Sequence, residues 1–401
     1  MEIGWVDFLK EDQNRVQDLI RSLDEGAVDE LGLGRIRDAF ADYFFPGTST
    51  VQTRAKYFLL VPKMLYEIAR KCKTTNEIEE LMNKKEKEYR NSLCKQLMND
   101  KKDKRDTDWD GIIGGSLFEE KGWVIRPHRD IYWNGIKTYG ICQMPPQEKN
   151  LSVNGFVKRL IDSKKKDYDA KKKDYDDDEK WSYKINSDFL NICEIVNEKN
   201  IELNDKEADF LKKRICNSKK DSLLAIILND KNLYELIKED EVKSFKDCYK
   251  KIKKKITDNE LLENLILANK FNNLAIILFR EYNKILGTIK EEDLNDKDDN
   301  IADDIINEDE LKKIKEIAKI SDNSELYKFL LAVIENIRNN EDNKGIITER
   351  EKRIKKDKSK IYKKEEGKDS FKEGEWVGMI ELDYRYKNAK KLITDIYNAK
   401  K

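Results

Sequence analysis

The stretch LGLGRIRDAFADYFFPGTSTVQTRAKYFLLVP, residues 31–62, decides the expected fold. Two glycines open an apolar-patterned helix, and Pro46–Gly47 makes a turn. The hydroxyl side chains of residues 48–50 can cap a second helix, which would continue to residue 62. Helix, tight turn and helix within such a short span predict a helix-turn-helix unit.

Basic and hydroxyl side chains gather around this turn. Uncapped amide groups at a helix start can hold a phosphate together with such side chains. The candidate anion or nucleic-acid contacts are Arg35, Arg37, Thr50, Thr53, Arg54 and Lys56. The alternative interpretation is structural, with an N-cap and with Arg37 and Arg54 paired to carboxylates such as Asp38 and Asp42.

The stretch TDWDGIIGGSLFEEKGWVIRPHRDIYWNGIKTYGI, residues 107–141, is the second informative segment. Its Asn134–Gly135 pair can turn a hairpin, whereas the apolar side chains around it fall on helical spacing. We favour a helix and keep the hairpin as the alternative; a winged-helix domain would require a wing. Arg129 and Trp133 are candidate contacts for a partner, and the alternative is an exposed arginine beside buried aromatic rings.

Patterns that would indicate catalysis or a metal are weak. DTDWDG, residues 106–111, matches half of a calcium loop, but Leu117 stands where the loop needs a glutamate. Asp110, Glu119 and Lys121 imitate the cluster of metal-dependent nucleases, which stays a minor alternative. We assign no catalytic residue, no metal ligand and no cofactor, and we lean against an enzyme.

Charge is abundant and balanced, with 80 basic and 80 acidic residues among 401. This balance argues against coating nucleic acid through bulk charge, although it allows a local basic patch. Six scattered cysteines and a single histidine make a zinc site improbable and indicate reduced thiols. Neither a signal peptide nor a membrane-length apolar run is evident, so we expect a cytoplasmic protein without membrane contact.

The five prolines all lie within the first 146 residues, and helical spacing dominates after them. We expect a mainly α fold. An irregular module with the helix-turn-helix-like segment would span 1–160, followed by a charged linker or insertion at 161–182, a helical domain at 183–290 and a helical region with charged loops at 291–401. Asn204 with Glu207 predicts a capping box, Gly287 a helix stop and Ser324 an N-cap.

Three segments, FPGTSTVQTRAKYF, IYWNGIKTYGI and ELDYRYKNAKKLITDI, carry a further observation. With them the chain resembles, almost end to end, a prokaryotic family catalogued as a domain of unknown function. The resemblance implies a mainly helical protein encoded among mobile or defence genes, and it supplies no reaction, substrate or cofactor. It adds Asp383 and Arg385 to the candidate contacts, with a salt-bridged lead-in to the final helix as the alternative.

These patterns lead to one functional expectation with two alternatives. We expect a non-enzymatic, nucleic-acid-associated or assembly protein that contacts DNA or RNA through residues 31–62. The first alternative is a helical scaffold that binds a partner protein, such as an enzyme. The second is the metal-dependent nuclease. The oligomeric state stays open.

Overall fold

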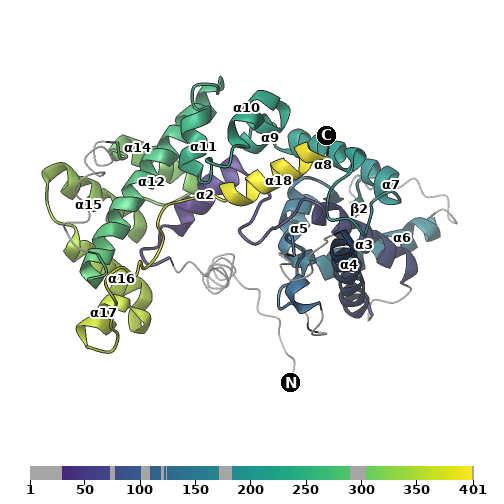
Figure 1. The fold of residues 1–401 in the computed structure, drawn as a ribbon, viewed down its shortest axis with the longest axis horizontal. Coiled ribbons are helices and arrows are strands. Elements are labelled where there is room, and N and C mark those ends of the chain that lie inside the picture. Colours follow the sequence, from purple (N-terminus) through teal and green to yellow (C-terminus); the bar gives the residue numbers. More distant parts are fainter. Residues whose placement is uncertain are drawn as a thin grey trace. The chain divides into compact units, whose positions relative to one another are not determined.

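The structure is a computed structural model that describes residues 29–72, 77–100, 109–118, 122, 124–170, 183–289 and 304–399, with side chains left out for 164–170 (Figure 1). Helices make up most of this part of the chain, so the predicted mainly α fold is confirmed. Its strands are β1 (Cys142–Gln143) and β2 (Lys184–Ile185), which pair antiparallel.

The chain forms two compact units whose segments interleave along the sequence. Unit 1 contains the residues up to Phe40 together with Asp258–Leu382, and unit 2 contains Ala41–Thr257 together with Asp383–Lys401. The chain therefore passes between units at 40/41, 257/258 and 382/383. Of the expected linker, 161–170 belong to α6 (Val153–Ala170), and 171–182 lie outside the described residues.

Unit 1 is organised around α12 (Asn259–Leu286), which ends at Gly287 with φ 74° as predicted. Buried asparagines of α12 bind an irregular segment of the same unit. Asn272 Oδ1 accepts from the Leu382 amide at 2.7 Å, and Asn283 Oδ1 accepts from the Val377 amide at 2.8 Å. These side chains accept hydrogen bonds from backbone amides that have no partner in a helix or strand. The helices that follow are α14 (Glu308–Ala318), α15 (Glu325–Asn339), α16 (Lys344–Lys355), η4 (Lys356–Lys358) and α17 (Lys360–Glu365).

Unit 2 packs α3 against α5 and α6, and it packs the last helix, α18, against α8 and α9. The Asn204–Glu207 capping box at the start of α8 is confirmed. Near the end of α18, Tyr397 stacks on Tyr234 of α10 with ring centroids 4.0 Å apart. The helices of this unit are α3 (Tyr57–Lys71), α4 (Ile78–Asp100), η1 (Gly115–Leu117), α5 (His128–Thr138), η2 (Pro146–Glu148), α6, α7 (Ser187–Cys193), α8 (Asp205–Ser218), α9 (Leu223–Asn229), α10 (Lys231–Ile237), α11 (Phe245–Ile252) and α18 (Tyr386–Asn398).

The expected helix-turn-helix is not confirmed. The first helix is α2 (Gly34–Phe44), which runs across the 40/41 boundary, but the next helix begins only at Tyr57. Residues 45–56 are an irregular connection, far longer than the turn of a helix-turn-helix. Thr48 uses its hydroxyl to donate to the Phe45 carbonyl at 2.6 Å and caps no helix. The two-residue strands β1 and β2 do not form the hairpin that a wing requires.

Residues 128–138 form helix α5, so the favoured interpretation of IYWNGI is confirmed. Gly135 is needed there for close packing rather than for a turn. A Cβ at this position would lie 2.3 Å from the Gly47 carbonyl oxygen and 2.5 Å from the Phe58 ring. Gly135 therefore lets α5 press against the connection that precedes α3.

Replacing Gly135 with alanine tests this packing. Gly135→Ala should lower the free energy of unfolding by about 2–3 kcal/mol, because the added methyl group meets a backbone oxygen. In the control Gly345→Ala, the new Cβ has nothing within 4 Å in helix α16. That control should raise stability by at most about 1 kcal/mol. Urea unfolding checks both, and a Gly135→Ala protein as stable as the wild type would contradict the close approach.

Candidate functional site

The backbone of residues 53–55 lies at the centre of the predicted anion site. The Thr53 and Arg54 amides donate to the Tyr132 hydroxyl at 2.8 and 3.0 Å. That hydroxyl in turn donates to the Arg54 carbonyl at 2.9 Å. Tyr132 is fully buried, so these backbone groups are satisfied inside unit 2. The expectation that free amides face water here is wrong.

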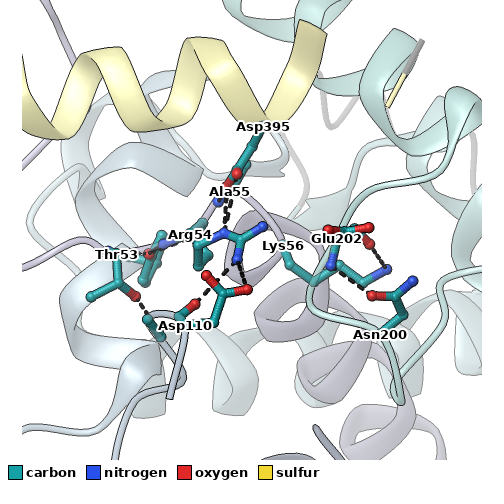
Figure 2. Close-up of polar contacts among 10 residues, drawn as sticks. Thr53, Arg54, Ala55, Lys56, Asp110, Asn200, Glu202 and Asp395 are labelled. Atoms are coloured by element: carbon teal, nitrogen blue, oxygen red, sulfur yellow. Dashed lines mark hydrogen bonds and ion pairs between the residues drawn. The ribbon is translucent and has the colours of Figure 1, made fainter. Parts of the chain in front are cut away.

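Arg54 binds two carboxylates of the same unit (Figure 2). Its Nε lies 3.1 Å from both carboxylate oxygens of Asp395 on α18, and its Nη1 lies 2.7 Å from Asp110 Oδ2. The Ala55 amide also donates to Asp395 Oδ2, at 2.7 Å. A guanidinium and an amide do surround an anion, as the sequence suggested, but that anion is the chain's own Asp395.

This arrangement leaves no room for an external phosphate. The Arg54 side chain is 13% exposed and that of Asp395 11%. The cavity beside Arg54 has a volume of about 10 Å³, enough for about one water molecule. Burial alone would lower the pKa of Arg54, but Asp395 and Asp110 outweigh burial and raise it, so the guanidinium stays charged. The expectation that Arg54 faces solvent is therefore wrong.

Lys56, another candidate contact, is completely buried, so its side chain does not lie on the surface. Its Nζ lies 2.7 and 2.8 Å from the two carboxylate oxygens of Glu207. It also lies 3.3 Å from the Glu202 carbonyl oxygen (Figure 2). Burial lowers the pKa of Lys56 and the Glu207 charge opposes that effect. Because Glu207 also forms the capping box of α8, this pair joins the start of α3 to the start of α8.

The other candidates around residues 31–62 also have structural partners. Arg35 donates to the Ala318 and Lys319 carbonyls at the end of α14, where a cation suits the helix terminus. Arg37 pairs with Asp38 at 3.2 Å, as the structural alternative predicted. Thr53 Oγ1 donates to the Gly111 carbonyl at 2.6 Å. Thr50 is exposed, and its carbonyl accepts from Asn388 of α18 at 3.1 Å.

The candidate partner contacts Arg129 and Trp133 are buried, with 6% and 7% of their surface exposed. Trp133 Nε1 donates to the Leu151 carbonyl at 2.8 Å. The arginine, expected on the surface in the structural alternative, is buried as well.

Asp383 and Arg385 lead into α18. Arg385 Nη1 donates to Asp42 Oδ1 at 2.6 Å and to the Thr48 carbonyl at 3.1 Å. Asp383 Oδ2 accepts from the Lys387 amide at 2.9 Å. The lead-in to α18 therefore contains an ion pair between Arg385 and Asp42.

A buried cluster that sequence reasoning missed joins Glu86 of α4 to the start of α5. Glu86 pairs through Oε2 with the Arg129 guanidinium and accepts the Arg129 amide through Oε1 at 3.0 Å. His128 Nε2 lies 3.5 Å from Glu86 Oε1. Burial raises the pKa of Glu86 to about 7 against the opposing Arg129 charge. Burial, with the Arg129 charge, lowers the pKa of His128 to about 3. The cluster is closed to solvent, and no local motif marks it.

The nuclease-like set is not assembled in the part of the chain that the structure describes. Asp110 binds Arg54, whereas Glu119 and Lys121 lie outside the described residues. Within the described ranges, no group of three or more histidine, cysteine, aspartate or glutamate side chains could hold a metal ion.

Exposed positive charge gathers instead at residues 243–255, which we call the lysine face. They contain seven lysines and one acidic residue. Helix α11 buries Phe245, Cys248, Tyr249 and Ile252, which leaves its lysines on the other side. Lys251 pairs with Glu239 at 2.7 Å, but no ion pair among the described residues engages Lys254 or Lys255. The run KKIKKK at 250–255 is the signal that could have identified this surface.

Comparison with known proteins adds the family. A model described as a family of unknown function, DUF6361, matches residues 1–315, so the chain belongs to this family and the resemblance seen in the sequence is confirmed. No curated protein and no solved structure matches the chain. Among the described residues, no helix is long and apolar enough to cross a membrane.

The single histidine gives a direct test of the buried cluster. A histidine in an unfolded chain titrates near pH 6.5, whereas His128 should stay neutral down to about pH 4 while the protein is folded. Because its folded pKa is lowered, the imidazole contributes stability above about pH 6.5 that is lost as the pH falls below that value. The one histidine resonance in an NMR titration checks this; a midpoint near pH 6.5 in the folded protein would contradict the burial.

Proposed function

We propose that this DUF6361 protein is a nucleic-acid-associated or assembly protein, without a reaction of its own, that holds DNA or RNA through the lysine face. The single observation that supports the proposal is a local surplus of exposed lysines on α11 and on the turn that follows it, where the apolar side of α11 is buried in unit 2. Because the chain as a whole is neutral, this surplus is a local feature rather than a consequence of net charge.

The chemistry of the lysine face suits phosphates. An ammonium group is a compact point charge that binds phosphate oxygens without a fixed geometry. Lys254 and Lys255 have no carboxylate partner among the described residues, so a phosphate would not have to break an ion pair to bind them. Contacts of this kind are independent of base sequence and weaken as salt rises.

Residues 31–62 are a poor site for a phosphate of DNA or RNA. An external phosphate at Arg54 would have to displace Asp395 from both the guanidinium and the Ala55 amide. Removing one partner from a largely buried ion pair typically costs about 3–5 kcal/mol, more than one phosphate contact returns. The proposal therefore keeps the expected class of partner and moves the contact to the lysine face.

A triple substitution tests the lysine face. Lys250→Gln, Lys254→Gln and Lys255→Gln together should weaken binding to a DNA duplex at low salt about tenfold or more. The slope of log affinity against log salt should become shallower by up to about 3, since each lost phosphate contact removes about 0.9. Fluorescence anisotropy at several salt concentrations measures both quantities.

The matched control replaces three exposed lysines elsewhere in unit 2: Lys206, Lys220 and Lys231. Their change to glutamine removes the same charge and should leave affinity within about twofold. A wild-type chain that binds neither DNA nor RNA at low salt, or an equal loss in both triple variants, would refute the proposal. A stoichiometric protein partner with no nucleic-acid binding would favour the scaffold alternative.

A further inference from the structure

Unit 1 has a basic surface of its own at residues 350–368, which we call the basic tip. It contains ten basic and four acidic residues and runs from the end of α16 through η4 and α17. Part of this charge has internal partners. Arg350 donates to the Leu31 carbonyl at 3.1 Å, Lys360 pairs with the buried Glu30 at 2.8 Å, and Lys364 donates to the Ile285 carbonyl at 2.8 Å.

Lys352, Arg353, Lys355 and Lys368 of the tip are held in ion pairs as well, which leaves three lysines near an exposed aromatic ring in the sequence. No ion pair or hydrogen bond among the described residues engages the side chains of Lys356, Lys358 or Lys363. Tyr362, next to Lys363, is 38% exposed, one of the few large apolar side chains on the described surface. The Lys368 ammonium lies 5.6 Å from the centre of its ring.

The tyrosine is held in place rather than loose. Its amide is capped by the Ser359 hydroxyl at 3.0 Å, at the start of α17. Its own hydroxyl hydrogen-bonds to Glu366, which raises the pKa of Tyr362. A fixed ring loses little conformational freedom when a ligand stacks on it.

We propose that the basic tip binds single-stranded DNA or RNA, with a base stacked on Tyr362 and Lys356, Lys358 and Lys363 on the neighbouring phosphates. Aromatic rings beside basic side chains are the usual platform for single strands, because every unpaired base has an exposed face. The inference rests on the proposed function and deepens it, since it specifies that unit 1 binds single-stranded nucleic acid.

Other anionic partners fit this surface less well. In a duplex the base faces are stacked against each other, so Tyr362 would add little to duplex affinity. An anionic membrane would need a larger apolar area to insert, but the tip exposes only about a third of Ile354 and of Tyr362 (36% and 38%). Charge and a single exposed ring together favour a single strand.

The test measures binding of the full chain to an oligonucleotide of about 20 nucleotides, single-stranded or duplex. Tyr362→Leu and Tyr362→Ala should weaken single-strand binding about tenfold, because stacking is lost, and leave duplex binding within about twofold. Tyr362→Phe keeps the ring and should bind like the wild type. Because leucine keeps an apolar side chain at this position, Tyr362→Leu should remain folded. Far-UV circular dichroism checks that each variant is folded.

The matched control is Tyr327→Ala in helix α15 of the same unit, where Lys315 lies 5.6 Å from the ring centre. It removes a tyrosine with a lysine contact outside residues 350–368 and should leave single-strand binding unchanged. Unchanged single-strand binding in Tyr362→Leu would overturn the inference, as would equal losses on single strand and duplex. The inference would also be overturned if the chain bound no single strand but bound phosphatidylserine vesicles in a way that depends on Tyr362.

Failure of the inference is distinguishable from failure of the proposed function. If duplex binding depends on the lysine face but Tyr362→Leu leaves single-strand binding unchanged, the inference about the basic tip fails and the proposed function is retained. A wild-type chain that binds neither strand form removes both.

Discussion

The contact between Arg54 and Asp395 is the constraint on which the rest of unit 2 depends. It joins residues 341 positions apart in the sequence and ties α18 to the segment that leads into α3. Asp395 also accepts the Ala55 amide, and Tyr132 satisfies the two amides before it. Without these partners the segment would bury unsatisfied donors, each at a cost of about 1–3 kcal/mol. A local turn is thus fixed by the end of the chain.

Arginines and lysines divide their roles in this protein. Arg54, Arg129 and Arg35 bind carboxylates or helix-terminal carbonyls with fixed geometry, for which the planar guanidinium is suited. Several lysines stay outside, above all on the lysine face and the basic tip. Among the described residues, Lys56 and Lys63 are buried instead: Lys56 pairs with Glu207, and Lys63 donates to the Val196 carbonyl. The arginines of the candidate site are therefore held by partners within the protein, whereas Lys254 and Lys255 have no carboxylate partner among the described residues.

The sequence predicts what short-range geometry determines. The Asn204–Glu207 box, the stop at Gly287 and the cap at Ser324 involve residues within one helical turn, and the structure has all three. The start of α3 was misplaced because tertiary hydrogen bonds, such as those of Tyr132, hold residues 45–56 out of a helix. The sequence does not predict the partner of Arg54, because no local pattern identifies a carboxylate on the last helix.

A double-mutant cycle between Arg54→Met and Asp395→Asn tests the central claim most directly. The free energies of unfolding of the wild type, both single variants and the double variant are measured in urea. A largely buried pair of this kind should show a coupling energy of about 2–3 kcal/mol. A coupling near zero, with the two single losses simply adding, would contradict the claim that Asp395 is the anion held by Arg54.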